Sequence, residues 1–461
     1  MQIELPFGDG TQAAEFPDHT MVIESGGRAK LKPLDDLEAA VQRALDRPLD
    51  SPPVEKLVRP GARVSIAFDD PTVGSFGPVR QVVIGQLLER LAAAGVDRGS
   101  VKLICANSLH RKFRPHELSL IIGDELVAEF GERLFCHDAE DPDTMVYLGK
   151  TPSGYDVEIS RHVVESDLTI YINAAHARGF NGGWKSVCVG LSSYRSIRHH
   201  HTPRGMSMSL HNNRMHAMLD EMGQLTEAKI AGSVFKVDTV LANPLQVAHL
   251  CAGTVSRTRQ ATLEVLSGAI DDRRNLSQER FDTIVYGIPN WSPYAVFASM
   301  NPLLTLVSSG LGYLGGMIQA LGRPGCTVIM ATPAPETWDE VHHPSYPVVW
   351  NEVLTKTRDP DEIARRYADR FATDRALIAK YRHEYAFHPI HAILACYPLV
   401  RLEQIGQVIV AGVEQAATAE HLGFRAAASV EEALEIAAHR HGNRGRIGYV
   451  RHPLAPGKVA A

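Results

Sequence analysis

The sequence predicts an α/β protein with two α/β domains, each built on a mostly parallel sheet. Short apolar strands alternate with amphipathic helices along the chain, which is the order of βαβ units. A length of 461 residues leaves room for two or three domains. A polar stretch at 271–280 separates two such runs. We therefore expect one domain over 1–275, a second over 281–439, a tail from about 440 to 461 free to pack back on the first, and the active site in the cleft between the domains.

Strands and helices alternate through the first 270 residues. Helix 78–94 places Val82, Leu87, Leu88 and Leu91 on one face and stops at Gly95. The predicted elements of this part are strand 63–68, helix 78–94, strand 101–106, helix 115–122, strand 167–173, a hairpin over 235–251 and helix 256–267.

The second half repeats the pattern after the polar stretch. Strands are predicted at 281–288, 326–331 and 407–411. The segment 429–438 is predicted to be a helix, because Ser429 is a good N-cap and Glu432 stands at the capping-box position. No internal repeat or low-complexity segment interrupts these elements.

Composition excludes several classes of protein. Lys and Arg number 47 against 53 Asp and Glu, a net charge of −6, so the concentrated basic surface of a nucleic-acid-binding protein is not expected. No run approaches about 18 apolar residues, and the N-terminus has no secretory signal pattern. The six cysteines stand singly, without a CxxC pair. We therefore expect a cytoplasmic protein with neither a membrane segment nor a disulfide scaffold.

Polar clusters follow three of the predicted strands. These are Asp69 and Asp70, then His110, then His176. Ligands of open α/β sheets bind beyond the carboxyl ends of the strands, so the three clusters are candidates for one site. Loops at strand ends are often polar without having a function. Any one of the three clusters, taken alone, could be such a loop.

A glycine-rich segment follows the strand that ends near His176. It reads Gly179-Phe-Asn-Gly182-Gly183-Trp184-Lys185-Ser186 and opens a helix. A nucleoside-triphosphate loop requires glycine directly before the lysine, and Trp184 stands there. Glycines still allow backbone N–H groups to approach an anion, and Lys185 adds a positive charge. A plain turn with a solvated lysine is the alternative.

Histidines cluster after this segment, at His199, His200 and His201, with His211 and His216 further on. Imidazole is a good ligand for zinc, copper and nickel. Three adjacent histidines cannot all reach one ion, so at most one or two would be ligands. A polar loop without a metal is the alternative.

Four other histidines are interpreted as surface residues. His383 and His388 resemble the HExxH motif of zinc proteases but are one residue too far apart to share a helix face. His388 and His391, like His342 and His343, are therefore expected at the surface.

Together these residues resemble the nickel-pincer lactate racemase family. The resemblance covers about 60–205, with a weaker continuation at Ala252-Gly253 and in the helix at 431–434. The motifs that carry it are Asp70-x-Thr72, Ser108-Leu-His110-Arg111, His137-Asp-Ala-Glu-Asp-Pro142, Val146-Tyr-Leu-Gly149, His176, Gly179-Phe-Asn-Gly-Gly-Trp-Lys185, and His201 sixteen residues after Lys185.

The resemblance implies a two-domain enzyme that carries nickel in a nickel pincer nucleotide, a pyridinium-3,5-bisthiocarboxylic acid mononucleotide. By position, Lys185 would join covalently to the cofactor and His201 would bind the nickel. His110 and His176 would be the acid/base pair. Residues near the cofactor would be Asp70, Thr72, Gly182 and Gly183.

The implied chemistry is consistent with these side chains. The hydrogen on carbon 2 of a hydroxy acid is hard to remove as a proton. If it leaves as hydride while a base takes the hydroxyl proton, a 2-keto acid forms, and return of hydride to the other face inverts the centre. Histidine, with a pKa near 6.5, suits proton transfer on each face, and the cofactor supplies the hydride chemistry.

The sequence departs from the lactate-handling members of the family. They carry an arginine directly after Asp-x-Thr, where this chain has Val73. Arg111 and Arg178 are the candidate replacements for binding the substrate carboxylate. His176 also lies one residue closer to Lys185 than in the family pattern.

The second domain departs further, because it lacks the Gln and Lys that lactate-type members place on one of its helices. Between 281 and 354 there is no lysine, and Arg323 is the one arginine. In place of these cations the second domain has hydroxyl, amide and aromatic side chains. Tyr313 is the candidate for substrate binding. The others are Trp291, Asn301, Ser308 and Ser309. Trp184, beside the cofactor lysine, is expected to reshape the pocket.

The leading hypothesis is therefore an isomerase: a racemase or epimerase of a 2-hydroxy acid other than lactate, such as a sugar acid or a bulkier hydroxy acid. The expected partners are the small-molecule substrate and cofactor-synthesis proteins, with no nucleic acid or membrane, and homo-oligomer formation is left open. A related hydride-transfer reaction on another hydroxyl compound is an alternative. A non-catalytic relative that only binds a nucleotide or metal is the alternative from another class.

Overall fold

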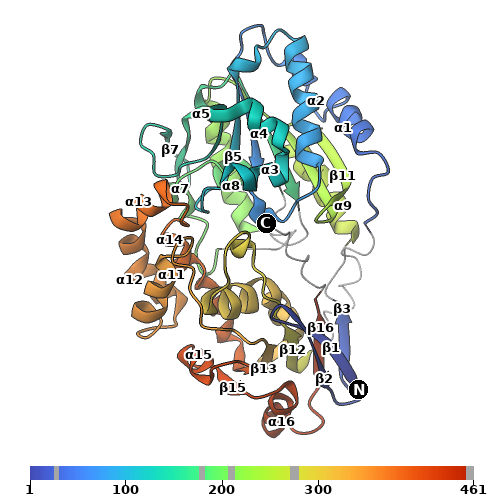
Figure 1. Ribbon diagram of the computed structural model, residues 1–461, viewed down its shortest axis with the longest axis vertical. Helices are drawn as coiled ribbons and strands as arrows, with labels where there is room; N and C mark the ends of the chain where they lie inside the picture. The colour runs from blue at the N-terminus through green and yellow to red at the C-terminus, as the bar shows by residue number, and fades with distance from the viewer. Residues whose placement is uncertain (25–30, 176–181, 206–212, 270–279, 453–461) are drawn as a thin grey trace. The chain divides into compact units, whose positions relative to one another are not determined.

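The computed structural model describes residues 1–24, 31–175, 182–205, 213–269 and 280–452. The chain folds as two compact units (Figure 1). The first unit contains the described residues of 31–269 together with 378–388. The second unit contains the described residues of 1–24, 280–377 and 389–452. Each unit has its own six-stranded sheet, so the predicted α/β class with mostly parallel sheets is confirmed.

The sheet of the first unit is parallel except at one edge. Its strands in sheet order are β11 (Gln246–Gly253), β10 (Ser233–Asn243), β9 (Leu168–Ala175), β4 (Val64–Asp69), β5 (Val101–Ala106) and β6 (Leu134–Cys136). Only β11 runs antiparallel, as the second strand of the expected hairpin. The chain runs from β4 outward to β5 and β6, then returns to β9 on the other side of β4. The order therefore reverses between β4 and β9, and such a reversal opens a crevice at the carboxyl ends of the strands.

Helices flank this sheet. They are α1 (Leu37–Asp46), α2 (Val79–Ala93), α3 (Pro115–Ile122), α4 (Asp124–Phe130), α5 (Arg161–Glu165), α6 (Lys185–Cys188), α7 (Tyr194–Ile197), α8 (Arg214–Lys229) and α9 (Val255–Ala269), with the hairpin β7 (Met145–Lys150) and β8 (Asp156–Ser160). Helix α2 buries Val83, Leu87 and Leu91 and ends before Gly95, whose φ of +83° suits glycine. The predicted α2 and α3 lie within one residue of these bounds.

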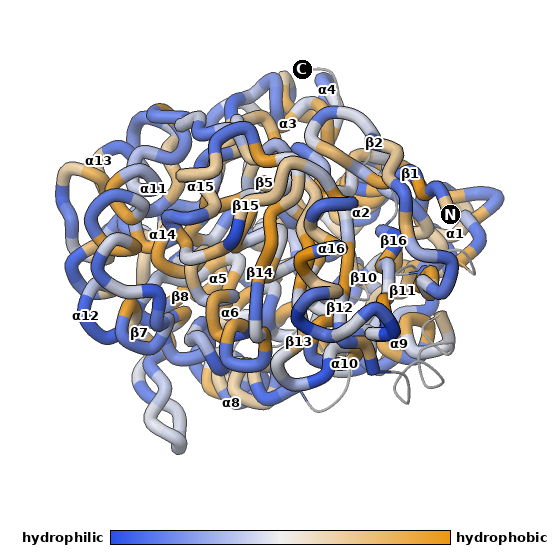
Figure 2. Tube along the Cα trace, turned by 90° about the horizontal axis from the view of Figure 1, so that it is seen from below, coloured by the Kyte–Doolittle hydropathy of each residue, from blue (hydrophilic) through white to orange (hydrophobic). Residues whose placement is uncertain are grey.

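The sheet of the second unit is wholly parallel. Its strands in sheet order are β15 (Arg425–Ala427), β14 (Ile405–Ala411), β13 (Gly322–Ala331), β12 (Phe281–Gly287), β16 (Ile447–Arg451) and β3 (Met21–Glu24). The antiparallel hairpin β1 (Gln2–Phe7) and β2 (Gly10–Glu15) shares the core of this sheet. Figure 2 shows β14 as largely hydrophobic and α12 (Pro360–Ala372) as largely hydrophilic, as expected for a buried strand and a surface helix.

The helices of the second unit include two with π geometry, Leu303–Leu314 and Val349–Val353. The α-helices are α10 (Ile318–Leu321), α11 (Ser345–Val348), α12, α13 (Arg375–His383, which continues into the first unit), α14 (Ile390–Leu394), α15 (Ala416–His421) and α16 (Val430–His441). The predicted N-cap of α16 is confirmed, because Ser429 Oγ accepts from the Glu432 N–H at 3.3 Å. The π-helix Leu303–Leu314 lies in a helical run to Leu321 that is long and apolar enough to cross a membrane. Most of this run is buried inside the protein, so core packing also explains its composition.

The observed units differ from the expected boundaries at three places. Residues 1–24 belong to the second unit, because β3 pairs with β16. The strand at 447–451 lies in the sheet of the second unit, so this part of the tail does not return to the first. Residues 378–388 join the first unit. Each difference depends on contacts between segments far apart in sequence, which local patterns do not encode.

Candidate functional site

The strand ends predicted to form a site lie on three neighbouring strands. β4 pairs with β9 on one side and with β5 on the other, all parallel, so their carboxyl ends meet at one edge. Asp69, at the end of β4, accepts hydrogen bonds from Tyr171 Oη at 2.8 Å and from the Ala174 N–H at 2.7 Å. These bonds tie the ends of β4 and β9 together. His176 follows β9 directly but lies outside the described residues.

Asp70 and His110 form a hydrogen-bonded pair at this edge. Asp70 Oδ2 lies 2.7 Å from His110 Nδ1, and its Oδ1 accepts from the backbone N–H and the hydroxyl of Thr72. A carboxylate only accepts, so Nδ1 carries the proton and Nε2 is the basic nitrogen of the neutral ring. The His110 side chain is 19% exposed and that of Asp70 only 3%. A buried carboxylate that orients a partly exposed imidazole is a general-base arrangement.

The glycine segment turns sharply into α6. Gly182 and Gly183 have φ of +69° and +67°, in the left-handed region that favours glycine. A Cβ on Gly182 would lie 2.9 Å from Asp238 Oδ2, and one on Gly183 would lie 2.4 Å from the Cδ of Arg259. Both positions therefore need glycine for space as well as conformation. Gly179 lies outside the described residues.

Trp184 does not line an open pocket. Its side chain is 6% exposed and belongs to the apolar core that includes α8. It covers Gly223 of that helix so closely that a Cβ there would lie 2.1 Å from the indole ring. The expectation that Trp184 reshapes the pocket is therefore not supported, because the indole is used in packing.

Lys185 begins α6 with its side chain half-buried. Burial lowers the pKa of Lys185 to about 8, and the nearby carboxylate of Asp69 opposes that shift. An amine with this pKa is neutral in a fraction of molecules on the order of a tenth at pH 7. The neutral form is the nucleophile, so the site favours a reactive lysine.

The three adjacent histidines have different roles. His199 Nε2 accepts from the Asp156 N–H at 3.0 Å, which ties that ring to β8. His200 is fully buried, and its Nδ1 lies 2.8 Å from His201 Nδ1. If His201 donates in this bond, its Nε2 keeps a lone pair that is available to a metal.

His201 lies in the same electrostatic environment as the other site residues. Burial, then the positive charges of Lys185 and His110, lower the pKa of His201 to about 3. The ring is therefore neutral at physiological pH, the state that metal binding requires. Within the described ranges, no three His, Cys, Asp or Glu side chains gather around a common point.

Arg111 is not placed to bind a substrate carboxylate. Its side chain is fully buried, and its two terminal nitrogens bind Glu117 of α3 at 2.7 and 3.0 Å. Glu117 also accepts from the Arg114 N–H at 2.7 Å, at the start of that helix. Burial would raise the pKa of Glu117, but the hydrogen bonds and charge of Arg111 lower it below its usual value. The structure therefore corrects the expectation for Arg111, whose guanidinium serves an internal ion pair.

Arg178, the other arginine considered for the substrate carboxylate, lies outside the described residues. Val73, which stands where lactate-type members have arginine, is 8% exposed in the turn Pro71–Val73 and offers no charge. The described part of this edge therefore assigns no arginine to the substrate.

Sequence reasoning missed two buried cations beside the site. Arg80 of α2 is 1% exposed, donates from Nη1 to Ser75 O at 2.7 Å, and its charge acts on Asp69 and Asp70. Arg80 lies one helical turn before Val83 and Ile84, on the buried face of α2. This spacing could have predicted from the sequence that Arg80 is buried.

The second missed cation, Lys236 of β10, is fully buried and forms an ion pair with Asp238 at 3.2 Å. It also donates to Ser186 Oγ, directly after Lys185. In the sequence, the burial of Lys236 could have been predicted from its apolar neighbours in the strand, Phe235 and Val237. Both cations compensate the buried carboxylates around the turn.

Three histidines expected at the surface are buried, and that expectation is wrong. His343 and His388 are fully buried and His391 is 4% exposed. His391 Nδ1 lies 2.7 Å from the hydroxyl of Tyr346, and His388 Nε2 lies 2.9 Å from Glu140 Oε1. Each polar ring is buried because a partner distant in sequence satisfies it.

The second unit has its own reversal of strand order, between β12 and β16. The chain leaves β12 into the loop that carries Trp291 and Tyr294. Tyr313 Oη donates to Tyr294 Oη at 2.9 Å, and Ser309 Oγ donates to Trp291 O at 3.3 Å. Asn301 caps the following helix instead, because its Oδ1 accepts from the Leu304 N–H. The carboxyl edge of this sheet therefore presents aromatic and hydroxyl groups.

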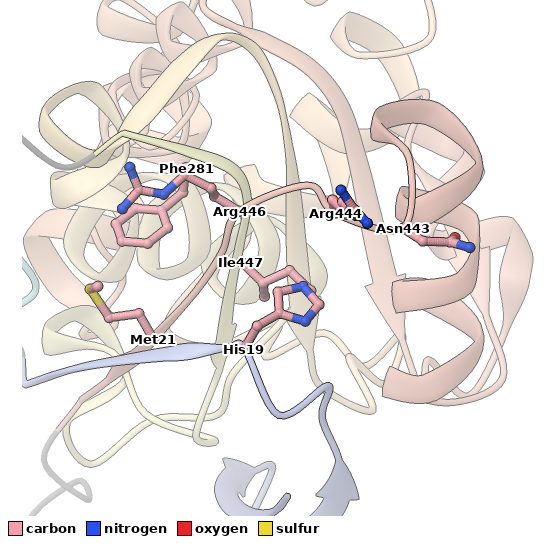
Figure 3. A pocket seen from close by; sticks show the side chains of 7 residues that line it. All are labelled: His19, Met21, Phe281, Asn443, Arg444, Arg446 and Ile447. Atoms are coloured by element: carbon pink, nitrogen blue, oxygen red, sulfur yellow. The ribbon is translucent and has the colours of Figure 1, made fainter.

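A surface hollow of about 440 Å³ lies on the opposite edge of the same sheet (Figure 3). Its lining residues are His19, Met21, Phe281, Asn443, Arg444, Arg446 and Ile447. Met21, Phe281 and Ile447 are the first residues of β3, β12 and β16. This edge carries the amino ends of the strands, where ligands of open parallel sheets are not expected.

Fold and site together define an α/β protein with a histidine–aspartate pair, a lysine of lowered pKa and a half-buried histidine at the carboxyl edge of one sheet. Residues 7–215 match the lactate racemase N-terminal domain family. The lactate racemase of Lactiplantibacillus plantarum is 28% identical over 262 residues, covering 54% of this chain and 59% of that protein. The lactate racemase of Thermoanaerobacterium thermosaccharolyticum is 26% identical over 278 residues, covering 58% and 62%. The segment 7–215 therefore belongs to the lactate racemase N-terminal domain family.

Two solved structures share the fold. The lactate racemase apoprotein from Thermoanaerobacterium thermosaccharolyticum has a TM-score of 0.67 at 20% identity and covers 98% of both chains. A protein from Thermotoga maritima has a TM-score of 0.52 at 14% identity, covering 92% of this chain and 96% of its own. At these identities the likeness concerns the fold alone. The sequence matches span about three-fifths of the length of the two curated relatives.

Proposed function

We propose that this chain is a racemase or epimerase of a 2-hydroxy acid and that it uses a nickel pincer nucleotide. The observation that carries the proposal is the 2.7 Å bond between Asp70 and His110, in a site where the charges of His110 and Lys185 both act on His201. An oriented base, a reactive amine and a neutral imidazole are the three groups that such a reaction requires from the protein.

His110 is the proposed base for the substrate hydroxyl. Its Nε2 takes the hydroxyl proton, and the Asp70 carboxylate stabilises the imidazolium that results. His176 is proposed for the same role on the opposite face of the substrate, which inversion requires. When bound, the cofactor would supply a reversible acceptor for the hydrogen on carbon 2.

The side chains present fit that cofactor. His201 offers Nε2 to nickel while His200 holds its other nitrogen, which is how an outer residue orients a metal ligand. Lys185 offers an amine with a lowered pKa for the covalent bond. Gly182 and Gly183 let the turn pack closely against Asp238 and Arg259, directly before Lys185.

We also propose that the substrate is larger or more hydroxylated than lactate. Val73 and the internally paired Arg111 leave Arg178 as the proposed carboxylate partner. In the second unit, Arg323 lies at the amino end of β13 and pairs with Asp282 at 2.8 Å, away from the carboxyl edge. Tyr313 is the proposed contact for a substrate hydroxyl or ring. A site that hydrogen-bonds such a group discriminates strongly against an analogue that lacks it.

The test is to produce the protein in a host that makes the cofactor and to measure intact mass, nickel content and racemisation. Substrates are lactate, aryl- and alkyl-substituted 2-hydroxy acids and sugar acids, each also with deuterium at carbon 2. Lys185→Ala should lose the adduct mass, and His201→Ala should lose nickel while His199→Ala retains it.

The outcomes separate the parts of the proposal. Nickel retained in His201→Ala but lost in His199→Ala would contradict the ligand assignment. Lactate as the fastest substrate would contradict the substrate proposal alone. A protein that holds nickel and racemises none of the acids would support the non-catalytic alternative.

A further inference from the structure

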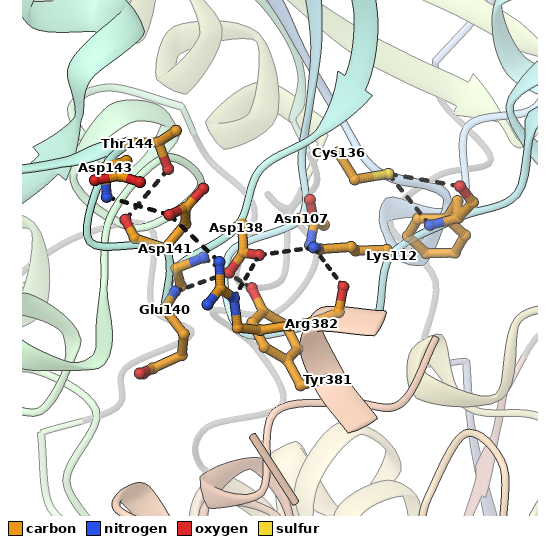
Figure 4. Close-up of polar contacts among 12 residues, drawn as sticks. Asn107, Lys112, Cys136, Asp138, Glu140, Asp141, Asp143, Thr144, Tyr381 and Arg382 are labelled. Atoms are coloured by element: carbon orange, nitrogen blue, oxygen red, sulfur yellow. Dashed lines mark hydrogen bonds and ion pairs between the residues drawn. The ribbon is translucent and has the colours of Figure 1, made fainter. Parts of the chain in front are cut away.

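Residues 378–388, here called the strap, pack on the first unit although the chain on both sides of them belongs to the second. The strap contains the end of α13 and the turn that follows. It contacts two loops of the first unit, one at 107–112, which carries His110, and one at 138–141 (Figure 4).

The hydroxyl of Tyr381 joins these two loops. It donates to Ser108 O at 3.0 Å and accepts from the Ala139 N–H at 3.0 Å. The Tyr381 side chain is fully buried, so both backbone groups depend on this hydroxyl rather than on water. Ser108 has a φ of +52°, a conformation that non-glycine residues adopt at a cost. The Tyr381 bond therefore holds a strained residue two positions before His110.

The end of the strap holds the next residues of the same loop. The His388 N–H donates to Leu109 O at 3.1 Å, and His388 Nε2 lies 2.9 Å from Glu140 Oε1. The ring of Phe387 lies against the ring of His110, with centroids 5.8 Å apart and planes tilted by 56°. His110 is thus placed between Asp70 on one side and the strap on another.

Ion pairs also hold the strap to the two loops, in addition to these contacts. Arg382 Nε lies 3.1 Å from Asp138 Oδ2, and Lys112 Nζ reaches the same oxygen at 2.7 Å. Lys112 Nζ also donates to Arg382 O at 2.8 Å. Lys112 is two residues after His110, so the loop is bound to the strap on both sides of the histidine.

We propose that the strap positions the His110 imidazole, with Tyr381 and Phe387 as the positioning residues. The proposal rests on the function proposed above, in which His110 is the base. Three consecutive features of the loop, the Ser108 carbonyl, the Leu109 carbonyl and the His110 ring, all contact the strap, whereas Asp70 holds only Nδ1. The aspartate therefore selects the tautomer, and the strap sets where Nε2 points.

This division predicts an effect on turnover rather than on binding. A base must lie within hydrogen-bond reach of the proton it takes, and displacement of a catalytic group by about 1 Å can cost on the order of a hundredfold in rate. The side chains of Tyr381 and Phe387 are 0% and 2% exposed, so their loss should not remove a contact to substrate.

The experiment compares Tyr381→Phe and Phe387→Leu with Tyr449→Phe in the full-length, cofactor-loaded protein. Tyr449 is a matched control: it is fully buried and its hydroxyl points at a backbone oxygen, Glu4 O at 3.5 Å, in the second unit. The measurements are kcat and KM on the fastest acid of the panel above, Tm, and the nitrogen-15 resonances of the His110 ring, identified by their loss in His110→Gln.

Both strap variants should lower kcat about tenfold and change KM less than about twofold. Their His110 resonances should keep the Nδ1–H tautomer that Asp70 sets but should shift and broaden, because the ring takes more than one orientation, while Tyr449→Phe changes at most Tm. Unchanged kcat and unchanged His110 resonances in both strap variants, with Tm lowered as in the control, would overturn the proposal. If His110→Gln itself keeps full activity, the proposed function fails instead, and the resonances still report whether the strap holds the ring.

Discussion

In the first unit the carboxyl ends of β4 and β5 lead to Asp70 and His110, whereas in the second unit the corresponding end of β12 leads to Trp291 and Tyr294. The strand order reverses between β4 and β9 in the first sheet and between β12 and β16 in the second, so both sheets have the geometry of a ligand crevice. One edge carries titratable groups with strong mutual electrostatics, and the other carries rings and hydroxyls bonded to each other.

The difference shows that topology provides a place for a site but not its chemistry. In the first unit, buried carboxylates are compensated by buried cations such as Arg80 and Lys236, which allows charged groups to remain in the interior. In the second unit, Tyr294 and Tyr313 are joined by a hydroxyl–hydroxyl bond that needs no compensating charge. The proposed proton transfer belongs to the first edge, and the proposed contact of Tyr313 with substrate is a separate hypothesis about the second.

The largest expected effect comes from the base of the first edge. His110→Gln keeps a polar side chain but cannot exchange a proton, so racemisation should fall about a thousandfold. Nickel content and adduct mass should stay at the wild-type level. Full activity in this variant would contradict the proposal that proton transfer takes place at the first edge.

The ion pair of Arg111 tests whether cations of the first unit serve structure or substrate. Glu117→Gln leaves Arg111 buried without a counter-charge and should lower the free energy of unfolding by about 3 kcal/mol, measured by urea denaturation at pH 7. The folded-state pKa of Glu117 is depressed, so its stabilisation is present above about pH 4.3 and is lost as the pH falls further. The difference from wild type should therefore shrink in acid.

Glu362→Gln, at an exposed pair with Arg366, is the control for this measurement and should change stability little. If Glu117→Gln raises KM and leaves stability unchanged, Arg111 belongs to substrate binding after all.

The reactivity of Lys185 should depend on pH in a way that exposed lysines do not share. Because its pKa is about 8, acylation of Lys185 by acetic anhydride in the cofactor-free chain should fall about tenfold for each pH unit below 8 and level off above it. Peptide mass spectrometry measures this against other lysines of the same digest, for which an ordinary pKa is about 10.4. A Lys185 profile that coincides with theirs would contradict the effect of burial.

The smallest effect is expected at the second edge. Tyr313→Phe removes one hydroxyl and its bond to Tyr294, so KM for the preferred acid should rise several-fold with little change in kcat. The ratio of activity on that acid to activity on lactate should fall as well. A loss of kcat without a change in KM would indicate that the second unit takes part in proton transfer.

Local pattern determined much of the first unit's architecture. The bounds of α2 and α3, the strands β4, β5 and β9, and the hairpin β10–β11 follow from periodicity and stop signals between neighbours in sequence. The clustering of Asp70 and His110 also followed from sequence, because consecutive βα units bring the carboxyl ends of parallel strands to one edge.

Tertiary structure decided what each polar side chain does. Whether Arg111 meets a substrate or Glu117, whether His388 faces water or Glu140, and which of His199 and His201 is tied to Asp156 depend on partners that local pattern does not identify. The same holds for the site itself, because Tyr381 of the strap bonds Ser108, which is 273 residues away in the sequence. A buried polar group is satisfied by whatever the fold brings within about 3 Å, and that is fixed only when the whole chain has packed.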